Sequence, residues 1–146
     1  MSNDLREASR ALALLGRTLE RACADLTLAQ YRVLAMVASG DARASKLAER
    51  LAVGKPTVTA VVDGLVDRGF LRREAVPGDR RSASIVVTDA GRARLAEAED
   101  AMSARLEHLL GAVTDRKAFV RGLAEIEASM RAEFQAKLDA APAGRR

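Results

Sequence analysis

Apolar residues near the start of the chain recur at alternating intervals of three and four. They are Leu5, Ala8, Leu12, Leu15, Leu19 and Ala22. This spacing places apolar side chains on one face of a helix and is typical of a helix that packs along another helix. The pattern predicts an amphipathic helix whose apolar face is buried either within the chain or against a second copy of it.

A second helix is expected to begin after Thr27, because Thr27 and Gln30 have the spacing of a capping box. Its apolar positions are Val33, Leu34 and Val37. The Ser-Gly-Asp sequence at 39–41 is expected to end it.

The segment 44–65 predicts two short helices joined by a tight turn. Their apolar positions are Leu47, Ala48, Leu51, Val58, Val61, Val62 and Leu65. The small Ala48 allows the two helices to approach closely. Pro56 is tolerated in the first turn of the second helix, and Gly69 is expected to end that helix with a positive φ. This is a helix-turn-helix pattern, whose second helix normally lies in the DNA major groove.

The periodicity changes after Gly69 to that of short strands. Two strand candidates, 70–75 and 83–87, flank a turn-rich basic segment at 76–82. A β-hairpin directly after the recognition helix makes the module a winged helix. A long cationic side chain at the hairpin tip can reach the minor groove.

Two long helices are expected to complete the chain, beginning at Thr88-Asp89 and at Thr114-Asp115, with a break near Gly111. Their apolar positions are Leu95, Ala98, Met102, Leu106 and Leu109, then Phe119, Leu123, Ile126, Met130, Phe134 and Leu138. The expected fold is mainly α with a small β-hairpin.

A single domain over 1–146 is expected. A DNA-binding head covers 25–90, a connecting helix covers 88–111, and dimerisation helices cover 1–24 and 112–140. The long apolar faces exceed what one small head needs for its own core, which favours a homodimer. A two-fold dimer would present two recognition helices about 34 Å apart, one turn of DNA.

Charge is concentrated in the helix-turn-helix and the hairpin. The net charge is +4, and residues 43–81 hold nine basic against five acidic residues, while the flanking segments each sum to zero. Such a local excess is typical of phosphate binding, although an ordinary solvated face is the alternative. The absence of an apolar leader and the single cysteine favour a cytoplasmic protein.

The sequence holds no pattern typical of an enzyme, a metal site or a cofactor site. It lacks a Gly-rich phosphate loop and a Cys-x-x-Cys pair, and His108 is its only histidine. Cys23 is interpreted as a quiet, partly buried thiol, because the neighbouring Asp25 would raise its pKa, although Arg21 is also close. A redox sensor acting through Cys23 is kept as an alternative.

Several segments resemble the MarR family of transcriptional regulators over roughly residues 5–138. They are Leu26–Tyr31, Lys46–Leu51, Pro56–Thr59, Val62–Leu65, Arg68-Gly69, Gly78–Arg81 and Val87–Gly91. The resemblance implies a homodimer that binds a pseudo-palindromic operator, usually as a repressor. It also implies release by a small, often phenolic or lipophilic ligand, or by oxidation of a cysteine.

The resemblance also suggests which residues bind DNA. The candidate positions are Ser45, Lys46, Lys55, Pro56, Thr57, Thr59, Arg73, Asp79, Arg80 and Arg81. Arg81 would enter the minor groove, with Asp79 bracing it. Ala60 and Gly64 replace basic residues that relatives commonly have. A larger share of the affinity is therefore expected from phosphate contacts and the hairpin. The alternative interpretation of the two threonines is that they are simple helix-start residues.

A ligand pocket is expected between the dimer helices and the DNA-binding head, near Leu15, Leu19 and Tyr31. The expected partners are double-stranded DNA, a second copy of the chain and a small-molecule effector. The sequence leaves open a constitutive or architectural DNA-binding protein that responds to no effector.

Overall fold

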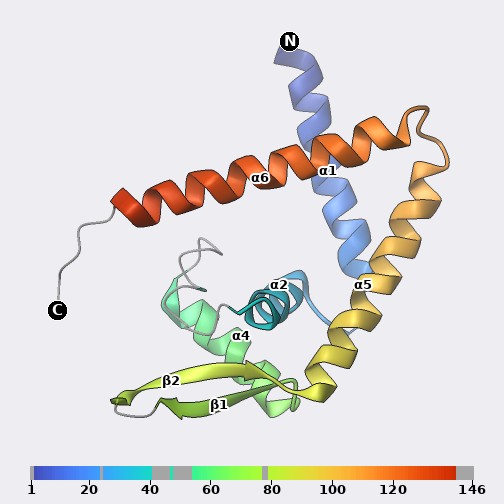
Figure 1. The fold of residues 1–146 in the computed structure, drawn as a ribbon. Coiled ribbons are helices and arrows are strands. Elements are labelled where there is room, and N and C mark those ends of the chain that lie inside the picture. The colour runs from blue at the N-terminus through green and yellow to red at the C-terminus, as the bar shows by residue number, and fades with distance from the viewer. Residues whose placement is uncertain (1, 24, 41–46, 48–53, 77–78, 141–146) are drawn as a thin grey trace. The chain divides into compact units, whose positions relative to one another are not determined.

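The computed structural model describes residues 2–23, 25–40, 47, 54–76 and 79–140 of the 146-residue chain. Its elements are α1 (Ser2–Ala22), α2 (Leu28–Ala38), α4 (Lys55–Asp67), β1 (Leu71–Val76), β2 (Asp79–Val87), α5 (Asp89–Leu110) and α6 (Arg116–Ala140) (Figure 1). The chain divides into two compact units, Met1–His108 and Leu109–Arg146. The described part is mainly helical with one two-stranded antiparallel hairpin, as the sequence predicts.

The capping box at the start of α2 is confirmed. Thr27 Oγ1 accepts a hydrogen bond from Gln30 N at 3.2 Å, and Gln30 Oε1 accepts one from Thr27 N at 3.0 Å. Glu20 of α1 adds a third contact, because its Oε1 accepts from Leu28 N at 3.1 Å. The end of α1 therefore holds the first turn of α2 through a backbone amide that the helix itself leaves unpaired.

Helix α4 begins after Gly54, has Pro56 in its first turn, and ends at Arg68 and Gly69. Gly69 has a φ of 75°, as expected for a glycine that ends a helix. The first helix of the predicted helix-turn-helix, including Ala48, lies outside the described residues except for Leu47, which is helical and fully buried.

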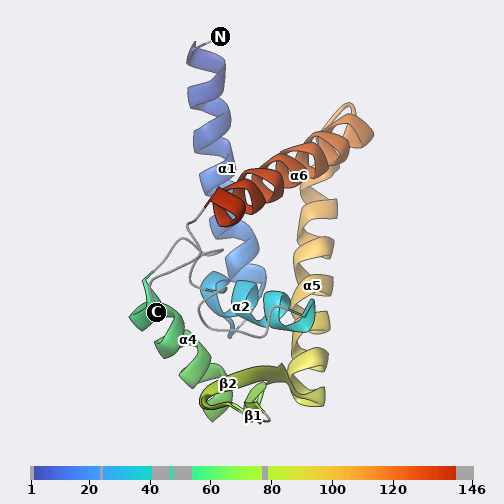
Figure 2. The same ribbon diagram turned by 60° about the vertical axis from the view of Figure 1, so that its left-hand side comes forward.

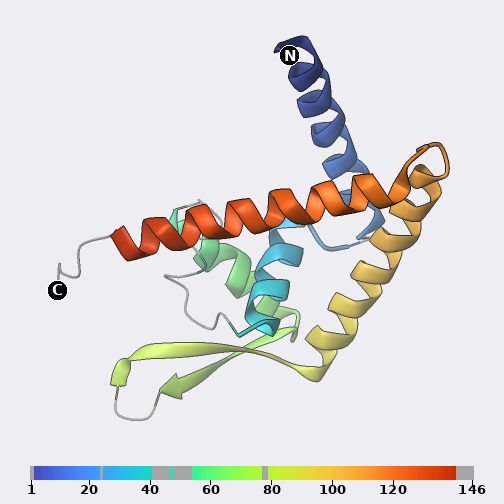
Figure 3. The same ribbon diagram turned by 45° about the horizontal axis from the view of Figure 1, so that its top comes forward.

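The hairpin is longer than the sequence predicts. Leu71 pairs with Val87 and Val76 pairs with Asp79, with an irregularity between Ala75 and Val76. The expectation that the second strand begins at residue 83 is therefore wrong. Backbone pairing continues past the apolar pattern, because amide and carbonyl groups pair whatever side chains they carry. The hairpin extends from the start of α5 away from that helix (Figure 3).

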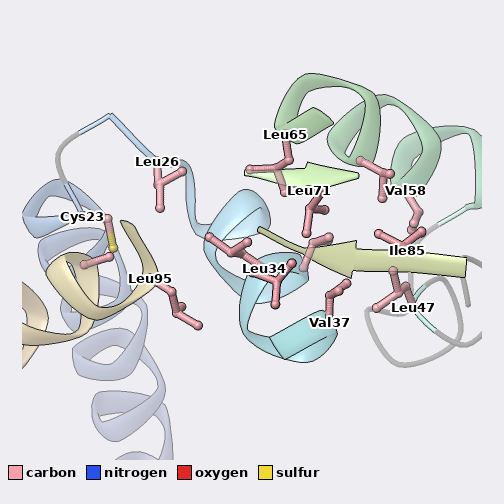
Figure 4. Packing of buried hydrophobic residues seen from close by; sticks show 14 residues of the cluster. Cys23, Leu26, Leu34, Val37, Leu47, Val58, Leu65, Leu71, Ile85 and Leu95 are labelled. Atoms are coloured by element: carbon pink, nitrogen blue, oxygen red, sulfur yellow. The ribbon is translucent and has the colours of Figure 1, made fainter. Parts of the chain in front are cut away.

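Helix α2 lies between α4 and α5, and it contacts α4 and β2 (Figures 1 and 2). Buried apolar side chains join these elements into one core. They are Cys23, Leu26, Val33, Leu34, Val37, Leu47, Val58, Val62, Leu65, Leu71, Ile85, Val87, Leu95 and Ala98. Leu34 and Val37 point toward the hairpin, while Cys23 and Leu95 lie together at the other end of the cluster (Figure 4). Burial of these apolar faces is what holds α4 against the hairpin.

The start of α5 packs directly on the end of α4. Thr88 Oγ1 donates a hydrogen bond to Gly69 O at 2.6 Å and accepts one from Gly91 N at 3.0 Å. Thr88 N also donates to Phe70 O at 3.1 Å. Thr88 therefore caps α5, as predicted, and at the same time fixes the turn that follows α4.

The second unit contains α6, whose first turn is capped by Asp115, since its Oδ1 accepts from Ala118 N at 2.8 Å. On the apolar face predicted for this helix, Ile126 is 53% exposed and Met130 is 64% exposed. In the first unit, Leu5 of α1 is 61% exposed. None of the helices in the described ranges combines the length and the apolar character needed to cross a membrane.

Candidate nucleic-acid interface

Helix α4 has one buried face and one solvent face. The buried positions are Val58, Val62 and Leu65. The exposed positions in its first two turns are Pro56, Thr57, Thr59 and Ala60. The capping position is Gly54, so neither threonine caps the helix. The apolar face thus holds the helix in place while the small polar side chains face outward, which suits close approach to a DNA groove.

An ion pair joins the recognition helix to the hairpin. Arg73 of β1 donates through Nη2 to Asp63 Oδ1 of α4, and both side chains are about half exposed. Arg73 was expected to contact DNA; here its guanidinium faces α4, so phosphate contact remains a prediction. Its visible role is to fix the position of the hairpin relative to α4.

Of the other residues predicted to contact DNA, some have only a known backbone position, and two lie outside the described residues. Ser45 and Lys46 lie outside them. Lys55 is the first residue of α4. Asp79, Arg80 and Arg81 are the first three residues of β2, so they belong to a strand and not to the turn in which the sequence analysis placed them. These three residues lie at the outer end of the hairpin, where Val76 pairs with Asp79.

A second group of charged residues lies at the opposite end of α4, and sequence reasoning missed it. Asp25, between α1 and α2, accepts hydrogen bonds from Arg68 at the end of α4 and from Arg94 of α5. We call these three residues the Asp25 cluster. Arg94 holds the pKa of the Asp25 carboxyl below its usual value by hydrogen bonding, and the charge of Arg68 adds to this effect. The partners are 43 and 69 residues away in sequence, so no local pattern signals the contact.

The cysteine is buried next to this cluster. Cys23 Sγ donates to Leu19 O at 3.4 Å. Burial raises the pKa of the Cys23 thiol, Arg94 partly offsets this, and Glu20 raises it further. The raised pKa of the thiol that the sequence predicts is confirmed, but its main cause is burial and not the neighbouring Asp25. The environment favours an unreactive thiol.

The residues expected near a ligand pocket, Leu15, Leu19 and Tyr31, are each partly buried. A surface depression of about 320 Å³ lies by the end of α1. It is lined by Arg17, Glu20, Arg21, Asp25, Leu26 and Thr27, so the three expected residues are not among those described around it. The described residues hold no group of three or more His, Cys, Asp or Glu side chains placed to bind a metal ion.

Residues 24–82 match the sequence model of the MarR family. The matched segment runs from the Asp25 loop through α2 and α4 into the hairpin. A MarR-family transcriptional regulator from Rhodococcus sp. RHA1 superposes with a TM-score of 0.75 at 21% identity, covering 89% of this chain and 94% of the other. Over residues 24–82 the chain matches the MarR family, and its fold is that of MarR-family regulators. The winged-helix fold predicted from the sequence is thereby confirmed, and the chain has the fold of a DNA-binding transcriptional regulator.

Two further solved structures extend the comparison. The transcriptional repressor CouR bound to a 23-mer DNA duplex superposes with a TM-score of 0.73 at 29% identity, covering 84% of this chain and 88% of CouR. CouR from Rhodococcus jostii RHA1 bound to p-coumaroyl-CoA gives a TM-score of 0.68 at 21% identity, covering 84% and 87%. A comparison with curated protein sequences found no match.

Proposed function

We propose that this chain is a homodimeric transcriptional repressor that binds a pseudo-palindromic operator and is released by a small lipophilic or phenolic ligand. The observation that carries the proposal is the arrangement of α4. Its apolar face is buried, its outer face carries Thr57 and Thr59, and the Asp63–Arg73 ion pair holds it against the hairpin. The whole net positive charge of the chain lies in residues 43–81, which include α4 and the hairpin.

The proposed DNA contacts divide into two groups. Lys55, Thr57 and Thr59 would face bases and phosphates from the major groove, with Ser45, Lys46 and Pro56 near the backbone. Arg81 would enter the minor groove, with Asp79 bracing it and Arg80 near the backbone. The repressor CouR, of the same fold, is known bound to a DNA duplex, which supports this mode of binding.

The proposed dimer uses residues 1–24 and 112–140, with 25–90 as the DNA-binding head and 88–111 as the connecting helix. Large apolar side chains that a single chain leaves exposed on α1 and α6 support it. They are Leu5, Leu12, Leu14, Val120, Ile126 and Met130. Large apolar side chains left exposed on these helices favour association with a second apolar surface. Two-fold symmetry would then present two recognition helices to one face of DNA.

The proposed effector is a small lipophilic or phenolic molecule bound near Leu15, Leu19 and Tyr31. CouR from Rhodococcus jostii RHA1 binds p-coumaroyl-CoA, which supports ligand control in a protein of this fold. Redox control through Cys23 is disfavoured because the thiol is buried and its pKa is raised.

Fluorescence anisotropy with labelled duplexes tests the proposal. DNA flanking the gene that encodes the chain is first footprinted to find the operator. The chain should bind that operator tightly, ignore a shuffled duplex, and lose affinity steeply as salt rises. Arg81→Ala should weaken binding by about 1–2 kcal/mol. Arg105→Ala, which removes an exposed arginine from α5, should bind like the parent.

Equal binding to the operator and to the shuffled duplex would overturn sequence-specific regulation. Phenolic and lipophilic compounds are then added to the preformed complex. If none of them releases the DNA, the effector is wrong and a constitutive DNA-binding protein takes its place. If Arg81→Ala binds as well as Arg105→Ala, the minor-groove role of the hairpin is wrong.

A further inference from the structure

The loop between α1 and α2 reaches the end of the recognition helix through a single carboxylate. Asp25 Oδ2 accepts from Arg68 Nη2, and Arg68 Nη1 donates to Asp25 O at 3.1 Å. The other carboxylate oxygen, Oδ1, accepts from Arg94 Nε at 3.0 Å and from Arg94 Nη2 at 2.7 Å. One acidic side chain therefore connects two cations that belong to different helices.

Arg94 is the more firmly held of the two cations. Its side chain is only 13% exposed, and its Nη2 also donates to Cys23 O at 2.6 Å. It makes a further contact of 3.4 Å with Glu97 one turn along α5. Because a guanidinium with little solvent needs partners for its charge, Arg94 fixes the position of Asp25 on α5.

Arg68 links Asp25 to the end of α4. It is the C-cap residue of that helix, and its guanidinium lies 4.7 Å from the centre of the Phe70 ring. The next residues along the chain, Gly69 and Phe70, are held by Thr88 at the start of α5. The end of α4 is thus held twice, once by hydrogen bonds to Thr88 and once by Asp25.

We propose that Asp25 is a positioning residue for the recognition helix, coupling the α1–α2 loop and α5 to operator binding through Arg68 and Arg94. This inference rests on the proposed function, because it concerns how well α4 is presented to DNA. Asp25 is not a DNA contact in this scheme. It acts through the two arginines, and its loss leaves two neighbouring cations without the anion between them.

Coupling of this kind is reciprocal, which supplies a second readout. If Asp25 links operator binding to the loop, operator binding must in turn stabilise the loop. Cys23 is the only cysteine of the chain, it is buried, and its carbonyl is held by Arg94. Its thiol reacts only when the loop opens locally, so the reaction rate reports that opening.

The test compares Asp25→Asn, which keeps the size of the side chain and removes its charge, with Asp67→Asn. Asp67 is exposed near the same helix end, and the described residues provide no ion-pair partner for it. Both variants lose one negative charge, so any general change in attraction to DNA is shared. Operator affinity is measured by anisotropy at several salt concentrations, with far-UV circular dichroism as the check on folding. The reaction of Cys23 with a disulfide reagent is timed with and without saturating operator.

Asp25→Asn should bind operator roughly tenfold more weakly than Asp67→Asn, with an unchanged salt dependence because no phosphate contact is lost. Cys23 should react more slowly in the parent when operator is bound, and Asp25→Asn should lose most of that protection. Asp25→Glu should restore part of both effects, because it returns the carboxylate. Arg68→Gln removes the α4 side of the cluster and provides the same test if Asp25→Asn does not fold.

The outcomes separate the two proposals. Parent protein that binds operator, with Asp25→Asn and Arg68→Gln binding as well as Asp67→Asn, overturns the positioning role alone. A Cys23 reaction rate that operator leaves unchanged in the parent does the same. Parent protein that binds no operator overturns the proposed function and this inference with it.

Discussion

The carbonyl oxygen of Phe70 lies only 2.1 Å from the position that a Cβ on Gly91 would occupy. The Phe70 carbonyl carbon and Val87 Cγ2 are each 2.9 Å from the same position. Two of these three atoms belong to the backbone, so the contact cannot be relieved by rotating a side chain. Glycine at 91 therefore allows α5 to start directly against the turn that ends α4.

We expect Gly91→Ala to destabilise the fold by about 1–3 kcal/mol, because the added methyl group forces α5 away from Phe70. Urea unfolding followed by circular dichroism measures the change. Gly122→Ala in α6, with nothing within 4 Å of its Cβ position, is the matched control and should not destabilise. Equal stability of Gly91→Ala and the parent would contradict the close packing.

Gly64 in α4 is the opposite case. Its nearest neighbour at the Cβ position is Gln30 Nε2 at 3.9 Å, an ordinary contact. Gly64→Ala should therefore raise the free energy of unfolding by about 0.5–1 kcal/mol, since alanine restricts the unfolded chain and favours helix. Urea unfolding measures it, and Gly16→Ala in the open part of α1 gives a comparison. A loss of stability in Gly64→Ala would mean that α4 packs more tightly at this position.

The Asp25 cluster predicts a pH dependence of stability. The pKa of the Asp25 carboxyl is lower in the fold than its ordinary value, so the carboxylate stabilises the fold at any pH above that ordinary value. The contribution is lost as the pH falls through the lowered pKa. The difference in unfolding free energy between the parent and Asp25→Asn should thus be present at pH 7 and disappear in strong acid. The effect is kept small by solvent, because the Asp25 side chain is 63% exposed.

Urea unfolding of both proteins at a series of pH values measures this difference. Asp67→Asn, lacking an ion pair within the described residues, should show no comparable difference. A constant gap between the parent and Asp25→Asn at every pH would place the effect in packing and not in charge.

The exposed apolar face of α6 predicts the effect of a charge on assembly. Ile126→Glu should shift the chain from dimer toward monomer, because the carboxylate would be buried in the proposed interface. Ala128→Glu adds the same charge on another face of the same helix, about 200° further round, and should remain dimeric. Sedimentation equilibrium at micromolar concentration distinguishes the two. A monomeric parent would reject the dimer itself.

Local patterns in the sequence predicted most of the helices, because their signals lie within a few residues. The capping box at Thr27 and Gln30, the start of α4 around Pro56, and its end at Gly69 each depend on neighbouring residues only. The start of β2 was misplaced at residue 83, since its backbone pairing extends beyond the apolar alternation.

The sequence by itself determined which faces are apolar and where the positive charge lies, because side-chain type and period set both. It also supported the family resemblance that the comparison with known proteins bears out. Only the tertiary structure decided which distant residues meet. The Asp25 cluster and the Asp63–Arg73 pair depend on how the helices and the hairpin pack. The close approach of Gly91 to Phe70 also depends on this packing, because the two residues do not belong to the same helix or strand. Burial of a common apolar core brings these residues together, and no spacing along the chain encodes that meeting.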